Sequence, residues 1–224
     1  MILGIYGSGG LGREVIVLAR QINAVGKRWS DVVFFDDFSG KDMTGKARGV
    51  TFDQAKFDQA KAKFSPDDVE ICIAVGEPSV RADVYDRFRD AGYKLATLIH
   101  PKVHIPEDTS VGRGAIICSG CFVSCGVGLS DNVLLQPAAS VGHDCRIGSH
   151  SVISTFVSLA GRCTIGTRTY IGMSVPVKED TTIGDDVIIG MGSVVLRNIE
   201  AGVVALGNPA RPMRANDSRR VFRQ

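Results

Sequence analysis

A histidine, an aspartate and a cysteine follow one another at positions 143–145, within the stretch VGHDCRIG. A histidine beside a carboxylate can accept a proton near neutral pH, and a cysteine can act as a nucleophile or bind a metal ion. A single histidine is nevertheless more often structural than catalytic. The residue types alone leave three interpretations: a base with its acidic partner, a metal site, or one turn of a regular structure. The spacing of the surrounding residues has to distinguish them.

The residues around this stretch repeat with a period of six. From Ile99 to Val195, seventeen positions spaced six residues apart all carry an aliphatic side chain. The residue four places after each of them is nearly always small or β-branched, and glycine often follows the aliphatic residue directly, as at Gly142 and Gly148. Hexapeptide periodicity is typical of a parallel β-helix, whose stacked coils bury a continuous aliphatic column. With three hexapeptides per coil, residues 99–200 predict between five and six coils.

This register indicates a packing role for the cysteines. Cys121, Cys145 and Cys163 fall on the small inward position, where a free cysteine behaves as a compact hydrophobic side chain. Cys118 and Cys125 flank Cys121, but a zinc site needs four ligands and no second pair stands at a suitable spacing. Cys145 is therefore a poor candidate for a nucleophile, and we expect no metal site.

His143 and Asp144 lie off the inward column, two and three places after the aliphatic Val141, and so near a corner of the predicted coil. A titratable pair at such a corner faces solvent or a neighbouring subunit. Packing gives no reason for a histidine there, and the register therefore strengthens the case for a chemical role of His143.

Up to about residue 98 the sequence alternates between strand-like and helix-like segments. The strand-like segments are Leu3–Tyr6, Val32–Phe35 and Glu70–Val75, and the helix-like segments are Leu11–Ile22 and Ser79–Ala91. This alternation is the βαβ pattern of a small parallel sheet. We therefore predict a small α/β, Rossmann-like N-terminal domain.

The first of these strands runs directly into the glycine-rich loop Gly7-x-Gly9-x-x-Gly12. Loops of this form turn backbone N–H groups and a helix N-terminus toward a phosphate. An acidic residue, Asp36 or Asp37, follows at the end of the next strand, where it can bond a ribose hydroxyl. Tight packing of the helix on the strand is the alternative explanation of the glycines. A domain this short suits a mononucleotide or a nucleotide sugar better than a dinucleotide.

Two further features of the N-terminal domain have less certain roles. Gly76, in IAVGEPSVR, offers another close approach of backbone to a ligand, and Arg81 is either a ligand contact or an exposed charge on a helix. The tandem pentapeptide FDQAKFDQAK at residues 52–61 has a period that fits neither helix nor strand. We interpret it as an incidental duplication within a helix or loop.

Composition and charge exclude several classes of protein. A chain of 224 residues with 44% hydrophobic residues can bury a core, and its net charge of +2 does not suggest a nucleic-acid binder. No segment approaches the roughly 18 apolar residues that span a bilayer, so we expect a soluble, cytoplasmic protein. The last fourteen residues hold five arginines and one aspartate. Such a tail is usually solvated, and its functional alternative is a clamp on an anionic ligand.

The order of the motifs GSGGLGREV, FFDDFSG, IAVGEPSVR, LIHP, VGHDCRIG and VVALGNPARPM resembles the bacterial nucleotide-sugar acetyltransferases typified by the bacillosamine-pathway enzyme. GDP-perosamine N-acetyltransferases and sialic-acid O-acetyltransferases are relatives of that family. The resemblance implies a nucleotide-sugar-binding α/β domain at residues 1–98, a left-handed parallel β-helix at 99–213 and a basic tail at 214–224. It also implies a homotrimer, with acetyl-CoA lying along the β-helix between subunits.

The resemblance assigns roles to individual residues. The positions that match substrate contacts are Gly9, Gly10, Leu11, Asp36, Asp37 and Gly76. His143 matches the general base, and Asp144 matches the neighbouring acid that raises its basicity. Gly161 matches the residue whose backbone N–H faces the thioester oxygen, and Met173 matches a further acetyl-CoA contact.

Two positions depart from the family pattern. Val152 stands where the family often has a second histidine, and Gln136 stands where it often has an asparagine. Both departures concern residues expected near the thioester and the acceptor. His150 lies two residues from the missing histidine but in a different register, so it is not a substitute.

The function implied is transfer of acetyl from acetyl-CoA to the amino group, at C4, of a nucleotide-linked amino-deoxy sugar in the synthesis of a surface glycan such as an O-antigen. The attack is direct, with His143 as general base, and neither a metal nor nucleic acid takes part. O-acetylation of a sugar of the sialic-acid type is the close alternative. A nicotinamide-dependent oxidoreductase, a zinc hydratase and a non-catalytic binding module are more distant ones.

Overall fold

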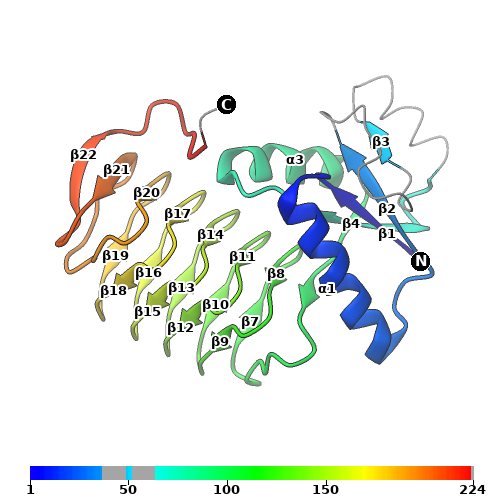
Figure 1. The fold of residues 1–224 in the computed structure, drawn as a ribbon, viewed down its shortest axis with the longest axis horizontal. Coiled ribbons are helices and arrows are strands. Elements are labelled where there is room, and N and C mark those ends of the chain that lie inside the picture. The colour runs from blue at the N-terminus through cyan, green and yellow to red at the C-terminus, as the bar shows by residue number, and fades with distance from the viewer. Residues whose placement is uncertain (37–48, 52–63, 223–224) are drawn as a thin grey trace.

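The computed structural model describes residues 1–36, 49–51 and 64–222. Asp37 and the tandem pentapeptide lie outside the described residues, as does the side chain of Asp36. Two units stand side by side in Figure 1: a long stack of coils and a smaller α/β unit with two helices.

The α/β unit, called the head from here on, is built on a five-stranded parallel sheet in the order β3-β2-β1-β4-β5. Its strands are β1 (Ile2–Tyr6), β2 (Asp31–Asp36), β3 (Gly49–Thr51), β4 (Val69–Ile73) and β5 (Lys94–Leu95), and its helices are α1 (Gly10–Gly26) and α3 (Pro78–Asp90). The predicted strands and helices are thus confirmed, with ends shifted by a few residues. Pro78 begins α3, a position that needs no backbone N–H.

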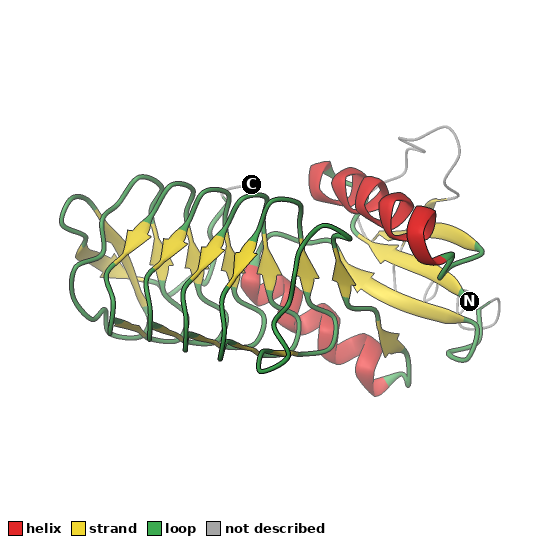
Figure 2. Ribbon diagram, turned by 90° about the horizontal axis from the view of Figure 1, so that it is seen from below, coloured by secondary structure: helices red, strands yellow, loops and turns green. Residues whose placement is uncertain are grey.

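The rest of the chain forms a parallel β-helix of about six coils (Figure 2). Each coil contributes a two-residue strand to three sheets, and each strand pairs with the one eighteen residues away, as Leu134 does with Val152. One sheet holds β6 (Leu98–Ile99), β8 (Ile116–Ile117), β11 (Leu134–Leu135), β14 (Val152–Ile153), β17 (Tyr170–Ile171) and β20 (Ile188–Ile189). We call this the head-facing sheet.

The other two sheets complete the triangular coil. The second holds β7 (Ser110–Val111), β10 (Gly128–Leu129), β13 (Arg146–Ile147), β16 (Thr164–Ile165) and β19 (Thr182–Ile183). The third holds β9 (Phe122–Val123), β12 (Ser140–Val141), β15 (Ser158–Leu159) and β18 (Pro176–Val177).

The second residue of each strand points inward and forms the aliphatic column predicted from the six-residue period. From Ile117 to Val195, every one of these aliphatic side chains is buried. The small positions are buried as well, with Cys145 and Cys163 at 0% exposure. The stacked column therefore supplies the core that no single coil could enclose.

The first residue of each strand points outward, and its type differs from sheet to sheet. On the head-facing sheet, Ile116, Leu134 and Val152 are all 0% exposed although they lie outside the coil. On the second sheet, Arg146 and Thr164 occupy the same place and are exposed. The apolar outer face of one sheet is thus the surface on which the head packs, and a single hydrophobic cluster runs from α1 into the coils.

Arg81 fixes the head to this face. Its side chain is 0% exposed, which contradicts both the expected ligand contact and the expected exposed charge. The guanidinium donates to the Ile73 and Val75 carbonyl oxygens at 2.6 and 2.8 Å. It also donates to the Oδ1 and the carbonyl oxygen of Asn132 at 2.8 and 3.0 Å. Burial lowers the pKa of Arg81 to about 10, so the side chain remains protonated at neutral pH and holds the head and the β-helix together.

The last two strands, β21 (Val203–Leu206) and β22 (Arg211–Ala215), form an antiparallel pair. After β22 the chain turns back toward α3 (Figure 1). β22 therefore continues past Met213, where the sequence places the end of the β-helix domain.

We expect Arg81→Ala to lower the free energy of unfolding by about 3 kcal/mol, because it leaves several buried acceptors without a donor. Urea unfolding followed by circular dichroism measures the change. Arg89→Ala is the matched control, since it removes an exposed ion pair with Asp86 from the same helix and should shift the midpoint little. Equal effects of the two substitutions would contradict the role given to Arg81.

Candidate active site

His143 and Asp144 lie in the turn that joins β12 to β13. We call residues 142–145 and those stacked on them the His143 corner. Asp144 has a φ of 59°, which is in the left-handed region. The residues at the equivalent place in other coils, Gly126, Arg162 and Asp180, are in the same region. The corner therefore has a fixed backbone conformation, which directs the side chains at 143 and 144 outward, as the register predicts.

The two side chains are hydrogen-bonded to each other. His143 Nδ1 lies 2.8 Å from Asp144 Oδ2, and the side chains are 48% and 59% exposed. A carboxylate can only accept, so Nδ1 carries a proton, and in the neutral imidazole Nε2 therefore has the lone pair. The geometry thus leaves Nε2 as an outward-facing proton acceptor.

Gly161 lies one coil further along the same corner, eighteen residues after His143. A Cβ at position 161 would lie 2.4 Å from His143 Nε2 and 2.6 Å from Cε1, so the imidazole occupies the space that a side chain would need. None of the described residues accepts a hydrogen bond from the Gly161 N–H. The structure therefore brings together two of the predicted groups, a base and a backbone donor.

The cysteine of the motif takes no part in this arrangement. The Cys145 thiol is buried and donates to the Ala160 carbonyl oxygen at 3.1 Å. A hydrogen bond with the Cys163 thiol and burial raise the pKa of Cys145, which keeps it protonated. A protonated, inward-facing thiol is a poor nucleophile, in keeping with the packing role predicted for it.

The glycine-rich loop of the head divides into two kinds of position. Gly7 has a φ of 101° and a Cβ there would lie 2.6 Å from the Ala74 carbonyl oxygen, while a Cβ at Gly12 would lie 2.0 Å from the Gly7 carbonyl oxygen. A Cβ at Gly9 or Gly10 would meet no heavy atom within 4 Å. Packing therefore explains Gly7 and Gly12, but it leaves open space in front of Gly9 and Gly10.

This open space lies where the order of the strands in the sheet reverses, at the topological switch point. β1 stands between β2 and β4, and the crevice at the carboxyl ends of such strands is where α/β sheets bind ligands. Gly9 is the N-cap of α1 and makes no side-chain cap, so a ligand can reach the first N–H groups of the helix. Leu11 is half-buried beside them, and Gly76 follows β4 on the other side. The backbone of Asp36 ends β2 at the same edge.

His143 and the head of one chain do not face each other. The head covers the head-facing sheet, whereas the His143 corner joins the other two sheets and so lies opposite it in the triangular coil. Met173 lies at a different corner, between β17 of the head-facing sheet and β18 of the third sheet, where it is 44% exposed. The predicted residues therefore form one site only if a second copy brings its His143 corner to the head.

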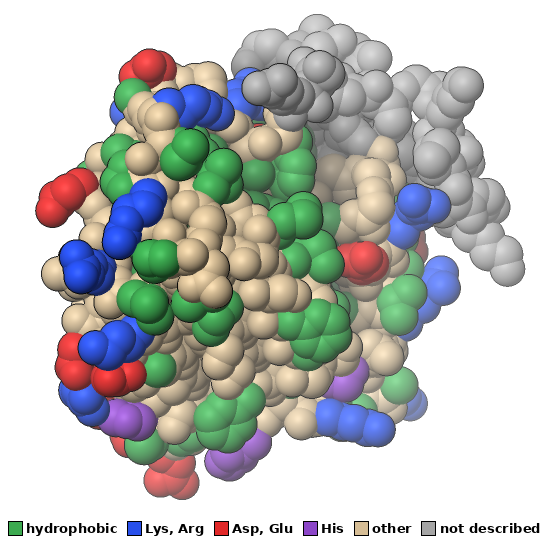
Figure 3. Space-filling model, turned by 60° about the vertical axis from the view of Figure 1, so that its left-hand side comes forward, with side chains coloured by type: hydrophobic (Ala, Val, Ile, Leu, Met, Phe, Trp, Pro, Cys, Tyr) green, Lys and Arg blue, Asp and Glu red, His purple; other side chains and the backbone are tan. Residues whose placement is uncertain are grey.

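Exposed hydrophobic side chains mark the corner that carries Met173. Phe156 and Met191 occupy the same corner and are 64% and 77% exposed. Figure 3, with the β22 end of the molecule turned forward, shows hydrophobic side chains in several patches over this side of the molecule. Exposed hydrophobic patches are typical of surfaces that contact another protein or a ligand.

The two departures from the family pattern fall on different parts of the coil. Val152 lies on β14 of the head-facing sheet and is fully buried beneath the head. Gln136 is half-buried in the turn between β11 and β12. Neither residue lies at the His143 corner of its own chain, because Val152 belongs to the head-facing sheet and Gln136 to the corner between that sheet and the third one.

Two absences hold for the described residues. Within the ranges 1–36, 49–51 and 64–222, no three or more His, Cys, Asp or Glu side chains converge as metal ligands would. In the same part of the chain, no helix is both long and apolar enough to cross a membrane.

This architecture is similar to that of several known proteins. Residues 3–88 match the model of the PglD N-terminal domain. The acetyltransferase domain of PglB from Neisseria gonorrhoeae FA1090 is 30% identical, with a TM-score of 0.86 over 95% of this chain and 99% of that one. PerB from Caulobacter crescentus, solved with CoA and GDP-perosamine, is 25% identical, with a TM-score of 0.82 over 96% and 98%. A GDP-perosamine N-acetyltransferase of Escherichia coli O157:H7 is 30% identical over 151 residues, which span 66% of this chain and 65% of that relative.

A small parallel α/β head on a left-handed β-helix, with a histidine at an outer corner, defines the class of hexapeptide-repeat acyltransferases. Within that class, the chain belongs to the family of nucleotide-sugar N-acetyltransferases that share the PglD N-terminal domain. The comparisons confirm the fold class and the family resemblance expected from the sequence.

Two neighbouring glycines should respond differently to alanine. Gly12→Ala places a Cβ against the backbone of Gly7 and should destabilise the protein by about 3 kcal/mol. Gly10→Ala enters open space in a helix and should keep or raise stability by up to about 1 kcal/mol. Thermal unfolding of the two variants measures the difference. A loss of stability in both would contradict the open space assigned to Gly10.

Proposed function

We propose that this protein transfers the acetyl group of acetyl-CoA to the C4 amino group of a nucleotide-linked amino-deoxy sugar, with His143 as general base. The observation that carries the proposal is the arrangement at the His143 corner. Nε2 is free to accept a proton, Nδ1 is held by Asp144, and the ring lies against the backbone of Gly161. The names of the relatives support a sugar amine as acceptor.

The reaction follows from these groups. The amine attacks the thioester carbonyl carbon and loses a proton to His143 Nε2 as the C–N bond forms. The C–S bond then breaks, and the CoA thiolate takes this proton from the His143 imidazolium and leaves as the thiol, which regenerates the base. Asp144 stabilises the imidazolium, and a base of this kind typically contributes about 10²–10⁴-fold. The Gly161 N–H is a suitable donor for the oxyanion that develops on the carbonyl.

The head suits the nucleotide part of the acceptor. The exposed N–H groups at the start of α1 attract the diphosphate, and the open space at Gly9 and Gly10 lets it approach the backbone. Asp36 is the last residue of β2 and Asp37 is the next residue in the sequence, and an acidic residue at such a position can bond a ribose hydroxyl. The sugar then extends to the opposite side of the crevice, toward Gly76.

The active enzyme is a homotrimer in this proposal. The His143 corner of one subunit meets the head of the next, because a single chain holds them on opposite sides of its β-helix. Acetyl-CoA lies between subunits, where Met173 and its exposed neighbours offer it an apolar contact. The reaction serves surface-glycan synthesis in the cytoplasm.

Release of the CoA thiol from acetyl-CoA, with UDP-, dTDP- and GDP-linked 4-amino sugars as acceptors, tests the reaction and the base together. His143→Ala should lower kcat by about 10²–10⁴-fold, because the amine then has no positioned base. His104→Ala, which removes an exposed histidine from the first coil, between β6 and β7, is the matched control and should keep wild-type activity.

Two results would contradict this proposal. Turnover of hydroxyl acceptors but of no amino sugar would make the protein an O-acetyltransferase. Full activity of His143→Ala with an amino sugar would show that another group accepts the proton.

A further inference from the structure

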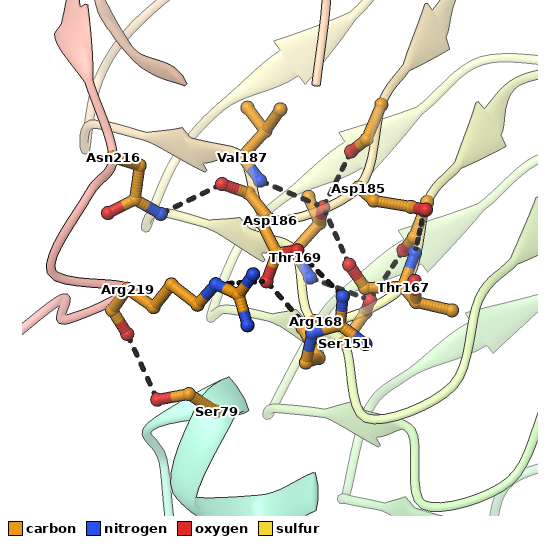
Figure 4. Close-up of polar contacts among 12 residues, drawn as sticks. Ser79, Ser151, Thr167, Arg168, Thr169, Asp185, Asp186, Val187, Asn216 and Arg219 are labelled. Atoms are coloured by element: carbon orange, nitrogen blue, oxygen red, sulfur yellow. Dashed lines mark hydrogen bonds and ion pairs between the residues drawn. The ribbon is translucent and has the colours of Figure 1, made fainter. Parts of the chain in front are cut away.

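The C-terminal tail follows a defined path back to the head. After β22, Asn216 donates from its backbone N–H to the Gly202 carbonyl oxygen at 2.8 Å, and from Nδ2 to the Asp186 carbonyl oxygen at 2.8 Å. Three residues later, the Arg219 carbonyl oxygen accepts a hydrogen bond from Ser79 Oγ at 3.0 Å (Figure 4). The tail therefore bridges the last coils and the first turn of α3.

A charged group anchors the middle of the tail. The Asp186 carboxylate is held by Arg168 at 2.7 and 2.8 Å, and it lies 3.8 Å from Arg219 Nε (Figure 4). The Asp186 side chain is only 15% exposed. Arg219 thus forms an ion pair with a residue of the last coils. The tail is therefore not the free solvated segment that its charge suggests.

The end of the tail is bound by a buried carboxylate. Glu77 precedes α3 and is 6% exposed. Its two oxygens accept from the Val221 N–H at 2.9 and 3.0 Å, and one accepts from the Phe222 N–H at 3.2 Å. A carboxylate is costly to bury without such partners, and hydrogen bonds to a charged acceptor are among the stronger ones. Glu77 therefore fixes residues 221 and 222 beside the end of β4.

These bonds place the Phe222 ring at the ligand crevice. The ring stands edge-on to Tyr170, with centroids 5.7 Å apart and planes at 83°. Its Cε2 lies 3.6 Å from where a Cβ of Gly76 would be. Phe222 nevertheless remains 54% exposed. An aromatic face held in place but open to solvent is suited to contact a ligand.

The position of the ring indicates which part of the ligand it meets. The backbone end of β2 at Asp36 and the glycines after β1 lie on one side of the crevice, where they suit the nucleoside and the diphosphate. Gly76 and Phe222 lie on the other side, beside β4 and the head-facing sheet. The group beyond the diphosphate, which is the sugar, extends in that direction.

We propose that Phe222 is a specificity-determining residue of the acceptor site, packing against the pyranose ring and holding its amino group in position. This inference rests on the function proposed above. The tail from Asn216 to Val221 acts as a positioning segment, and Glu77 is the group that holds its end.

Calorimetric titration tests the assignment, with UDP-, dTDP- and GDP-linked 4-amino sugars and the free diphosphates UDP, dTDP and GDP as probes. Phe222→Ala should weaken binding of the nucleotide sugar about tenfold and leave the affinity for the matching free diphosphate unchanged. Phe222→Tyr should restore the wild-type affinity because it keeps the ring. Met213→Ala removes an exposed apolar side chain from β22, ahead of the turn toward the head, and should change neither affinity.

A second variant tests the positioning of the tail. Glu77→Gln removes the charge that holds the Val221 and Phe222 N–H groups, so it should weaken nucleotide-sugar binding to a similar extent. It should also speed tryptic cleavage after Arg219 and Arg220. Wild-type rates of cleavage together with wild-type binding would overturn the role given to Glu77.

The outcomes separate this inference from the proposed function. Binding of a nucleotide sugar by the wild type, with equal affinity in Phe222→Ala, would overturn the inference and leave the proposed function standing. Equal weakening of the nucleotide sugar and of the free diphosphate would also overturn it. Failure of the wild type to bind any nucleotide sugar would overturn both.

Discussion

The eighteen-residue register of the coils is the constraint on which the rest of the structure depends. Each strand pairs with the strand one coil away, so each corner residue lies directly on its counterpart eighteen positions later. This register stacks the His143 ring on Gly161, whose missing side chain leaves the space that the ring fills. A base and a backbone donor thus become neighbours although neither lies in an irregular loop. The regular register of the β-helix thus positions the two groups to which the proposed function assigns the chemistry.

A second constraint comes from the outer face of the coils. One sheet carries apolar residues outside as well as inside, and the head must cover them. Arg81 sets the orientation, because its planar side chain satisfies carbonyl oxygens of β4 and of the Asn132 turn at the same time. With the head fixed there, the His143 corner points the opposite way. Assembly of several copies is then a geometric requirement of the proposed reaction.

The sequence predicts the β-helix well because its period is simple and unbroken. The aliphatic column, the small inward positions and the outward direction of His143 all follow from the register. The covering of one sheet could also have been predicted, since the residue before the repeat aliphatic is apolar at Ile116, Leu134 and Val152 but polar or small on the second sheet. Comparing the outer positions of the three sheets would have revealed the docking face.

Other features depend on contacts between distant residues and have no local signal. A lone arginine in a helix reads as exposed, and only the carbonyl oxygens gathered around Arg81 make its burial possible. The path of the tail depends on Glu77, which is 144 residues away from Val221 in sequence. The five arginines among the last fourteen residues suggest a solvated segment, whereas the hydrogen bonds of two backbone N–H groups to Glu77 fix the position of residues 221 and 222. The glycine-rich loop could be predicted only in part. The motif shows where the glycines are, but only the structure shows which of them have room for a Cβ and which do not.

The central claim is that a base from one chain serves the head of another, and subunit complementation tests it most directly. His143→Ala lacks the base, and Gly10→Asp places a negative charge where the diphosphate binds, so each variant alone should be inactive with a nucleotide-linked amino sugar. Co-expression in equal amounts, with differently tagged chains purified over both tags, yields mixed assemblies. The account predicts about a third of wild-type CoA release, since each mixed trimer of the proposed assembly has one interface in three that combines an intact base with an intact head. Mixed assemblies that remain as inactive as the single variants would contradict it.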